Sequence, residues 1–386
     1  MTRDWFDALA HLILGCSLGH SPFSDYKSEP HPLPHRICTH NTRFTMSNHD
    51  TRLSRSLGAI LGVHAGDSLG ATLEFEYHST IKQKYPDGLQ EIVGGGSFSW
   101  PPGHATDDTD LTRAVLLAYS DRRKHCETRA GREGSEFDVV KAAADYSLAW
   151  LTGDWPDREP GSMPVDIGCA TQTGLSNYDS TGDATRSGAG PGSAGNGSLM
   201  RCIPTALFSD SKEVRVRESM AISAITHNDT RCTVSCAAYN EMIAAMIQGK
   251  KVREAVEQGR LVAQEQGQTQ VEAAISRGET LDLAKLADQG PKSAGSDITT
   301  GYVLNGLTLA VAALLDPRSF KDVLVDVVRL GGDADTNGAI AGGALGARDG
   351  KEKIPESWLE TLQFGDEFEV KTKWLLSEWG SPRERA

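Results

Sequence analysis

The sequence predicts an all-α protein, and two patterns along its 386 residues support that prediction. In several long segments the apolar residues recur every three or four positions, which is the spacing of one face of a helix. The alternation of apolar and polar residues that marks a half-buried strand is nearly absent. We therefore expect a compact multi-helix domain in which long loops carry functional residues.

Four segments show the helical spacing most clearly. Their apolar positions are Leu53, Leu57, Ile60 and Leu61; Val139, Val140, Ala143, Tyr146 and Leu148; Met242, Ile243, Met246 and Ile247; and Val303, Leu307, Val311, Leu314 and Leu315. The chain also contains 40 glycines, which concentrate in the expected loops, notably at residues 94–96 and 182–197.

The last expected helix, residues 339–347, consists almost wholly of small residues. Each glycine in a helix interior lowers helix stability by roughly 1 kcal/mol relative to alanine. The large number of glycines in this segment therefore needs a structural reason. The natural reason is the close approach of another helix backbone. Such an approach would bring Asp333 and Asp335 beside Asp107 and Asp108.

Residues 1–50 differ from the rest of the chain, because they hold six of the eleven histidines and show no sustained periodicity. The weakly apolar stretch at residues 8–19 follows two aspartates and precedes no clear cleavage site, which argues against a secretory signal. We interpret residues 1–50 as a disordered N-terminal extension and residues 51–386 as a single domain.

The composition excludes several classes of protein. A formal net charge of −13 disfavours non-specific binding to nucleic acid, which needs a basic surface. No run of 18 or more apolar residues occurs, so we expect no segment that spans a membrane. The seven cysteines include no CxxC pair with histidine partners and are expected to be reduced. We expect a cytoplasmic monomer, with the nucleus as the alternative location.

Two acidic clusters, residues 106–109 (Thr-Asp-Asp-Thr) and 332–336 (Gly-Asp-Ala-Asp-Thr), each begin an expected helix. Adjacent carboxylates repel one another, and a cation between them relieves the repulsion. Carboxylate and hydroxyl oxygens favour hard cations such as Mg²⁺, Mn²⁺ or Ca²⁺. For either cluster alone, ordinary helix capping by Asp or Thr is the alternative interpretation. A third cluster, residues 66–70 followed by Glu74, favours the metal site.

Five motifs in a fixed order resemble the ADP-ribosylglycohydrolase family. They are residues 66–74 (GDSLGATLE), Pro102-Gly103 shortly before residues 106–109, residues 195–201 (GNGSLMR), Thr226-His227 and residues 331–336 (GGDADT). The family includes bacterial dinitrogenase-reductase-activating glycohydrolases and animal ADP-ribosylarginine and ADP-ribosylserine hydrolases. The resemblance implies the fold of that family and a hydrolase that cleaves N- or O-glycosyl bonds.

The resemblance also implies a cofactor of two Mg²⁺ ions, or two Mn²⁺ ions. The implied metal ligands are Thr106, Asp107, Asp108, Asp333, Asp335 and Thr336. Two such cations about 3.5 to 4 Å apart can hold vicinal ribose hydroxyls and lower the pKa of a bound water. The transition state is oxocarbenium-like, so a nearby carboxylate stabilises it. The candidate catalytic carboxylates are Asp107, Asp108, Asp335, Glu74 and Asp166.

The first motif contains two acidic residues with different expected roles. Glu74 matches a position that in some family members is a mobile glutamate near the metals, and an exposed helix glutamate is the alternative. Asp67, which is flanked by Gly66 and Gly70, is expected to support the metal ligands from behind rather than to bind metal.

A glycine-rich segment supplies the candidate contacts to ADP-ribose. Residues 190–195 match the GxGxxG pattern, but no strand precedes them, so a dinucleotide-binding fold is poorly supported. Backbone N–H groups of such a turn can still bind a diphosphate, although a simple flexible turn is the alternative. By resemblance, the candidate ligand-binding residues are Gly192, Ser193, Gly195, Asn196, Met200 and His227.

The segment Met163-Pro164-Val165-Asp166-Ile167-Gly168 is similar to one in the bacterial arginine-type enzymes. A carboxylate can bind a planar guanidinium through two hydrogen bonds, so Asp166 favours an arginine linkage. The alternatives are an ADP-ribosylserine hydrolase, an O-acetyl-ADP-ribose hydrolase, or a non-catalytic crystallin-like protein that binds ADP-ribose. The expected partner is an ADP-ribosylated protein or a small molecule that contains ADP-ribose.

Overall fold

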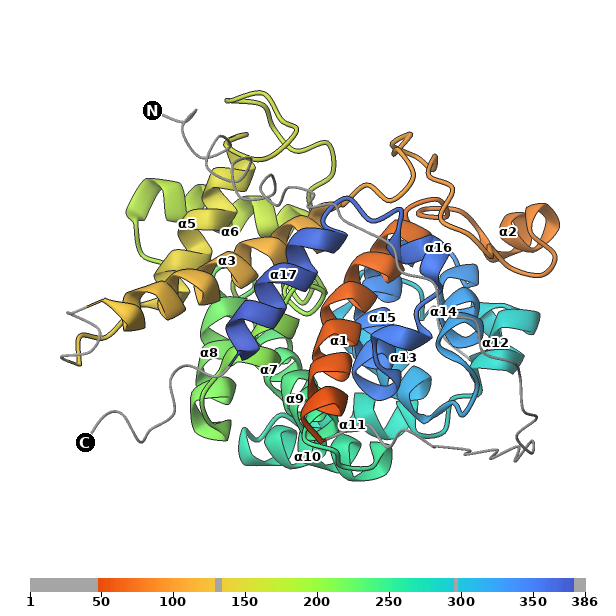
Figure 1. The fold of residues 1–386 in the computed structure, drawn as a ribbon. Coiled ribbons are helices and arrows are strands. Elements are labelled where there is room, and N and C mark those ends of the chain that lie inside the picture. Colours follow the sequence, from red (N-terminus) through yellow and green to blue (C-terminus); the bar gives the residue numbers. More distant parts are fainter. Residues whose placement is uncertain (1–47, 129–133, 295–297, 378–386) are drawn as a thin grey trace, which may run out of the picture. The chain divides into compact units, whose positions relative to one another are not determined.

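The structure is a computed structural model that describes residues 48–128, 134–294 and 298–377 (Figure 1). These residues form the all-α fold that the sequence predicts, and none of them belongs to a β-strand. The helices are α1 (Asn48–Gly70), α2 (His78–Lys84), α3 (Asp107–Glu127), α5 (Val139–Leu151), α6 (Cys169–Thr181), α7 (Ile203–Phe208), α8 (Lys212–Ala224), α9 (Thr230–Ile247), α10 (Val252–Glu265), α11 (Thr269–Gly278), α12 (Leu283–Gln289), η1 (Pro291–Ala294), α13 (Val303–Leu315), α14 (Phe320–Arg329), α15 (Ala334–Asp349), η2 (Lys351–Lys353), α16 (Glu356–Leu359) and α17 (Gly365–Leu376).

Most of the predicted N-terminal extension, residues 1–47, lies outside the described residues. Helix α1 already begins at Asn48, so residues 48–50 belong to the first helix rather than to the extension. In the described part of the chain, no helix is both long enough and apolar enough to cross a bilayer.

Helices α1 and α15 pack against each other in antiparallel directions over most of their lengths, as Figure 1 shows. A Cβ atom placed on Gly62 would lie 2.2 Å from the carbonyl oxygen of Gly342, and one on Gly66 would lie 2.0 Å from that of Gly338. Contacts this short leave no room for a side chain. The small residues of α15 therefore serve the close helix approach that the sequence predicts.

This helix pair sets the position of the first acidic cluster. Near the C-terminal end of α1, Asp67 accepts hydrogen bonds from the backbone N–H groups of Thr106 (3.1 Å) and Thr109 (3.2 Å) and from the Thr109 hydroxyl (2.5 Å). These bonds hold the first turn of α3 against α1. Because α15 begins beside the same end of α1, the N-termini of α3 and α15 meet.

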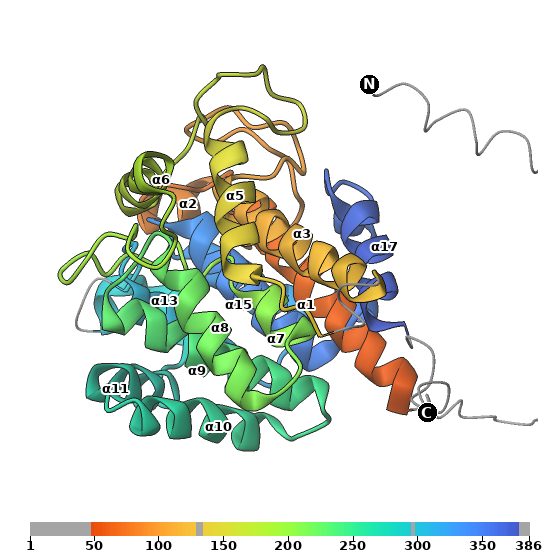
Figure 2. The same ribbon diagram turned by 90° about the vertical axis from the view of Figure 1, so that its left-hand side faces the viewer.

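Helix α9 lies at the centre of the other half of the molecule, and α8 and α10 cover it from outside (Figure 2). Every residue of α9 from Cys232 to Ile247 is buried. The hydroxyl of Tyr239 donates to the carbonyl oxygen of Ile340 at 2.6 Å, which links α9 to α15. Through α15, helix α9 and the loop before α7 are therefore packed against the same helices whose N-termini carry the acidic clusters.

Candidate active site

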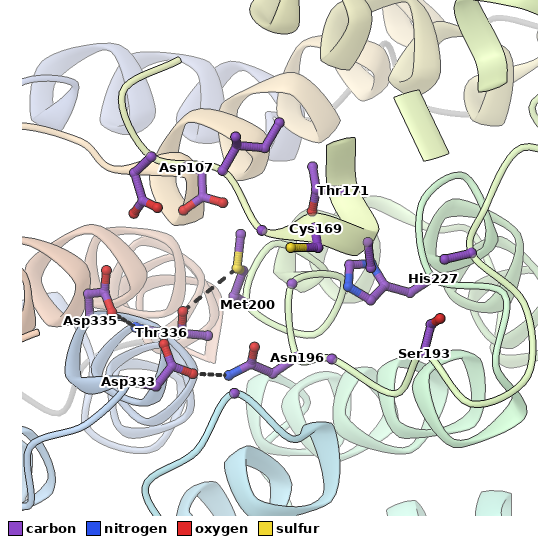
Figure 3. Close-up of a pocket in the computed structure, with 18 of the residues that line it drawn as sticks. Asp107, Cys169, Thr171, Ser193, Asn196, Met200, His227, Asp333, Asp335 and Thr336 are labelled. Carbon is purple, nitrogen blue, oxygen red and sulfur yellow. Dashed lines mark hydrogen bonds between the residues drawn. The ribbon is translucent and has the colours of Figure 1, made fainter. Parts of the chain in front are cut away.

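A cavity of about 600 Å³ opens where the N-termini of α3, α6 and α15 face the loop at residues 188–201 (Figure 3). Carboxylates gather at one side of this cavity, which we call the acidic end. The acidic end comprises Glu74, Asp107, Asp166, Asp333 and Asp335. The opposite side, which we call the glycine-loop end, comprises residues 193–197 and His227.

The acidic end is built from helix N-termini. Thr106 is the N-cap of α3, and its hydroxyl accepts a hydrogen bond from the backbone N–H of Asp108 at 3.3 Å. Asp108 Oδ2 accepts hydrogen bonds from the hydroxyls of Thr106 (3.2 Å) and Thr336 (3.3 Å). Asp108 therefore joins the two motifs that are 226 positions apart, although it lies behind the residues that line the cavity.

The remaining carboxylates converge from three other segments. Asp333 is the N-cap of α15, and its Oδ2 accepts a hydrogen bond from Asn196 Nδ2 at 2.5 Å (Figure 3). Glu74, Asp166 and Asp335 each place one carboxylate oxygen within 4.8 Å of the others. The structure thus brings together all six predicted metal ligands and the other two predicted catalytic carboxylates.

Burial raises the pKa of Asp107, Asp108 and Asp335 well above the usual range for aspartate, and neighbouring carboxylates raise it further. Burial likewise raises the pKa of Glu74 to about 8 and that of Asp166 to about 6. The charges that act most strongly on these groups are other carboxylates. The acidic end therefore favours the binding of protons or of metal cations.

The donors at this end fit hard divalent cations. Asp108 Oδ1 and Glu74 Oε2 are buried without a hydrogen-bond donor. Such atoms are costly in a protein interior unless something positive reaches them. All the ligands on offer are carboxylate or hydroxyl oxygens, as Mg²⁺, Mn²⁺ and Ca²⁺ prefer. The residues present are thus compatible with the metal cofactor that the resemblance implies.

Glu74 is buried, with 4% of its surface exposed, whereas the alternative interpretation made it an exposed helix residue. It follows α1 in a turn that the α15 motif holds, because the N–H of Phe75 donates to the carbonyl oxygen of Gly332 at 2.7 Å. Phe75 has a φ of 64°, which a side chain of its size rarely adopts. This strained turn directs Glu74 into the cavity wall.

The glycine-loop end is shaped by a buried histidine. A Cβ atom on Gly197 would lie 3.0 Å from His227 Cε1, and one on Gly195 would lie 3.2 Å from its Nε2. Burial lowers the pKa of His227 to about 3, and the nearby Arg201 lowers it too. His227 is therefore neutral, with its Nδ1 2.8 Å from the Thr226 hydroxyl. It lines the cavity and also supports the loop.

Gly192 is the one predicted ligand contact that does not line the cavity. Its backbone N–H donates to Asp229 Oδ2 at 2.8 Å, so that N–H group is not free for a diphosphate. Asp229 is in turn paired with Arg231, and the two side chains anchor the loop from outside. An Asp two residues before an Arg is the only sequence pattern that accompanies this anchor.

Sequence reasoning missed several residues that line the cavity. They include Phe75, Cys169, Thr173 and Gly301. Cys169 and Thr171 come from the first turn of α6, just after the Asp166 segment, and point into the cavity in Figure 3. Their position next to Asp166 in the sequence is the only signal that could have identified them.

Comparison with known proteins shows which family the chain resembles. A family model described as ADP-ribosylglycohydrolase matches residues 48–385. The chain is 30% identical over 320 residues to the ADP-ribosyl-dinitrogen reductase glycohydrolase of Rhodospirillum rubrum, covering 82% of this chain and 93% of that one. It is 26% identical over 343 residues to the ADP-ribosylarginine hydrolase Tri1 of Pseudomonas putida (strain GB-1), covering 89% of this chain and 81% of that one.

A solved structure of an ADP-ribosylglycohydrolase-related protein complex has a similar fold. It matches with a TM-score of 0.62 and 27% sequence identity, over 84% of this chain and 98% of that chain. The matched fold is all-α, as the sequence predicts.

Proposed function

The chain belongs to the ADP-ribosylglycohydrolase family and is a hydrolase, and from that premise we propose that it removes ADP-ribose from arginine side chains of proteins with the help of divalent cations. The observation that carries the proposal is the convergence of the carboxylates from residues 107–108, 333–335, 74 and 166 at one end of a cavity. A cavity of about 600 Å³ is in the range of small-molecule sites.

Metal dependence is supported by the donor set. Thr106, Asp107 and Asp108 on one side and Asp333, Asp335 and Thr336 on the other would hold two Mg²⁺ or Mn²⁺ ions. When bound, such ions neutralise the carboxylates, orient the vicinal ribose hydroxyls and lower the pKa of a water molecule. The protein's own contribution is to fix these oxygens on helix N-termini, and Asn196 fixes the Asp333 side chain.

The carboxylates also suit the developing charge of the reaction. Positive charge grows at the anomeric carbon as the glycosidic bond breaks, and a preorganised negative group stabilises it. Asp107, Asp335 and Glu74 line the cavity where that carbon would lie. The ADP part of the substrate would extend toward the glycine-loop end, along Ser193, Gly195, Asn196 and Met200.

An arginine linkage is supported by Asp166 and by relatives that are named ADP-ribosylarginine hydrolases. Asp166 is half-buried beside the reacting end of the cavity. A carboxylate there can bind the guanidinium of the leaving arginine through two charge-assisted hydrogen bonds. A serine leaving group offers no such cation.

The decisive experiment compares release of ADP-ribose from arginine-linked and serine-linked peptides, each with and without Mg²⁺, by wild type and Asp166→Asn. Charge-assisted hydrogen bonds are worth about 1.5 to 3 kcal/mol, so kcat/KM on the arginine-linked peptide should fall roughly ten- to a hundredfold. Inhibition by free ADP-ribose should change little.

Two results would reject parts of this proposal separately. Cleavage of serine-linked peptides alone would reject the arginine linkage and leave the metal-dependent hydrolase intact. Full turnover after exhaustive chelation, with residual metal excluded by elemental analysis, would reject the metal requirement.

A further inference from the structure

A second cavity, of about 280 Å³, adjoins the acidic end on the side away from the glycine loop. The two cavities share Asp107 and Asp166 and have no other lining residue in common. The second cavity lies between the segment at residues 100–107 and the loop at residues 150–166. Asp107 and Asp166 therefore lie at the junction of two cavities whose other lining residues differ.

The second cavity is acidic and aromatic. It is lined by five carboxylates and one arginine, together with aromatic and apolar side chains. The carboxylates are Asp107, Asp110, Asp157, Glu159 and Asp166, and the arginine is Arg158. Trp100 and His104 form one wall, with their rings stacked 4.9 Å apart at an interplanar angle of 20°. Aromatic faces and carboxylates together attract a planar cation such as a guanidinium.

The single arginine in this wall offsets only one of the five carboxylates, and its guanidinium is hydrogen-bonded to the backbone of the loop. Arg158 Nη1 donates to the carbonyl oxygen of Trp150 at 2.7 Å, and its Nη2 donates to that of Ser162. Asp110 accepts hydrogen bonds from the indole N–H groups of Trp150 and Trp155, both at 2.8 Å. The loop that carries Asp166 is thus held in place by α3 and α5.

The two cavities suit the two halves of one substrate. The glycine-loop end has no carboxylate among residues 193–197 and contains a neutral histidine, whereas the second cavity is rich in carboxylates. A diphosphate is repelled by the second cavity and a guanidinium is attracted to it. The bond between the two halves would then lie at the junction, beside Asp107 and Asp166.

We propose that the second cavity receives the arginine side chain of the ADP-ribosylated target, with Trp100, His104 and Glu159 forming its subsite. This inference rests on the proposed arginine linkage. Hydrolysis breaks the bond from the anomeric carbon to the guanidine nitrogen. The water hydroxyl joins that carbon, and the water proton ends on the nitrogen, so an arginine guanidinium cation leaves through this cavity.

The rim of the second cavity fits contact with a protein rather than with a free small molecule. Met163 and Val165 line the cavity and are exposed over 55% and 66% of their surfaces. Exposed apolar side chains at the mouth of a site mark a place where another surface docks. The target backbone would cross this rim while its arginine enters the cavity.

The test reverses one charge at the rim. Glu159→Lys changes an exposed residue, and Asp179→Lys, at an exposed position of α6 outside both cavities, is the matched control. Glu159→Lys should lower kcat/KM on an arginine-linked ADP-ribosyl peptide about five- to tenfold through repulsion of the guanidinium. Asp179→Lys should stay within about twofold of wild type. Inhibition by free ADP-ribose should be unchanged in both variants.

A second variant, Trp100→Ala, tests the aromatic wall and should cost about tenfold in kcat/KM on the same peptide. If its melting curve shows loss of folding, Glu159→Lys decides alone. Equal losses of kcat/KM in Glu159→Lys and Asp179→Lys would contradict the proposed subsite. Weaker inhibition of Glu159→Lys by free ADP-ribose would contradict it too. A wild type that leaves the arginine-linked peptide intact would reject the proposed linkage, which is a different result.

Discussion

Buried carboxylates occur at both ends of the main cavity, but only one end supplies its own counter-charge. Behind the glycine-loop end, Asp229 accepts from Arg231 Nε (2.9 Å) and Nη2 (2.7 Å) and from the N–H of Gly192 (2.8 Å). These bonds hold the pKa of Asp229 well below its usual range. At the acidic end, Asp108 and Asp335 face other carboxylates, and burial and repulsion raise their pKa.

This difference distinguishes carboxylates that stabilise the fold through ion pairs within the protein from carboxylates that need an external cation to compensate their charge. A paired carboxylate such as Asp229 stabilises the loop without any addition. The carboxylates of the acidic end are destabilising by themselves when charged, because burial and repulsion act together. A protein retains such an arrangement at a functional site, where a cation compensates it.

The largest expected effect comes from the acidic end. Asp335→Asn should lower turnover roughly 10²- to 10³-fold, as removal of one preorganised charge-stabilising group does elsewhere. In chelator, the same variant should melt at a higher temperature than wild type, because the buried carboxyl, which must either carry a charge or take up a proton on folding, is gone. A fall in melting temperature in chelator, of the kind expected for a structural carboxylate, would contradict the comparison.

A smaller effect is expected at the glycine-loop end. Arg231→Ala leaves Asp229 without its cation and should lower the free energy of unfolding by about 1 to 2 kcal/mol, because Arg231 is partly exposed. Arg186→Ala, whose partner Asp183 is 4.0 Å away on the surface, is the control and should change it by less than about 0.5 kcal/mol. Denaturant unfolding measures the free energy of unfolding of both variants. Equal losses in the two variants would show that the Asp229–Arg231 pair stabilises the fold no more than an ordinary surface pair.

The smallest effect is a pH dependence of stability. Glu74, with a pKa raised to about 8, binds its proton more tightly in the folded than in the unfolded protein. In chelator, stability should therefore fall as pH rises from 7 to 8.5. His64 and His227, with pKa lowered to about 4 and about 3, are neutral in the folded protein over that range, and in the unfolded protein they are mostly neutral, so they oppose the fall only weakly near pH 7. Melting curves with excess Mg²⁺ should show a shallower fall, and a rise in chelator would refute the assignment.

Much of the acidic end could be predicted from the sequence, because its motifs lie at helix ends and helix ends are local features. The motifs at residues 106–109 and 332–336 meet as the sequence predicts, and Asp67 supports Thr106 and Thr109 from behind. The close packing of α1 against α15, which brings these motifs together, is also visible in the sequence. Glycines recur every fourth residue in α1, at 58, 62, 66 and 70; the first three face glycines 346, 342 and 338 of α15, and the last faces Ala334.

Other parts of the site depend on long-range packing, which local patterns do not encode. The second cavity combines Trp100 with residues some 50 to 65 positions further along the chain. The anchoring of Gly192 by Asp229 and the direction of Phe75 also arise only when distant loops meet. Apart from the segment at residues 163–168 and the glycine-rich turn at residues 190–195, these residues carry no periodicity and no motif, so little in the sequence identifies them.

We propose that the acidic end binds divalent cations, and titration calorimetry measures such binding independently of turnover. Mg²⁺ or Mn²⁺ would be titrated into chelator-treated wild type, Asp335→Asn and Asp229→Asn under the same conditions. We expect saturable binding to wild type, similar binding to Asp229→Asn, and at least about tenfold weaker binding to Asp335→Asn. Equal binding to Asp335→Asn and wild type, or no binding to wild type, would contradict it.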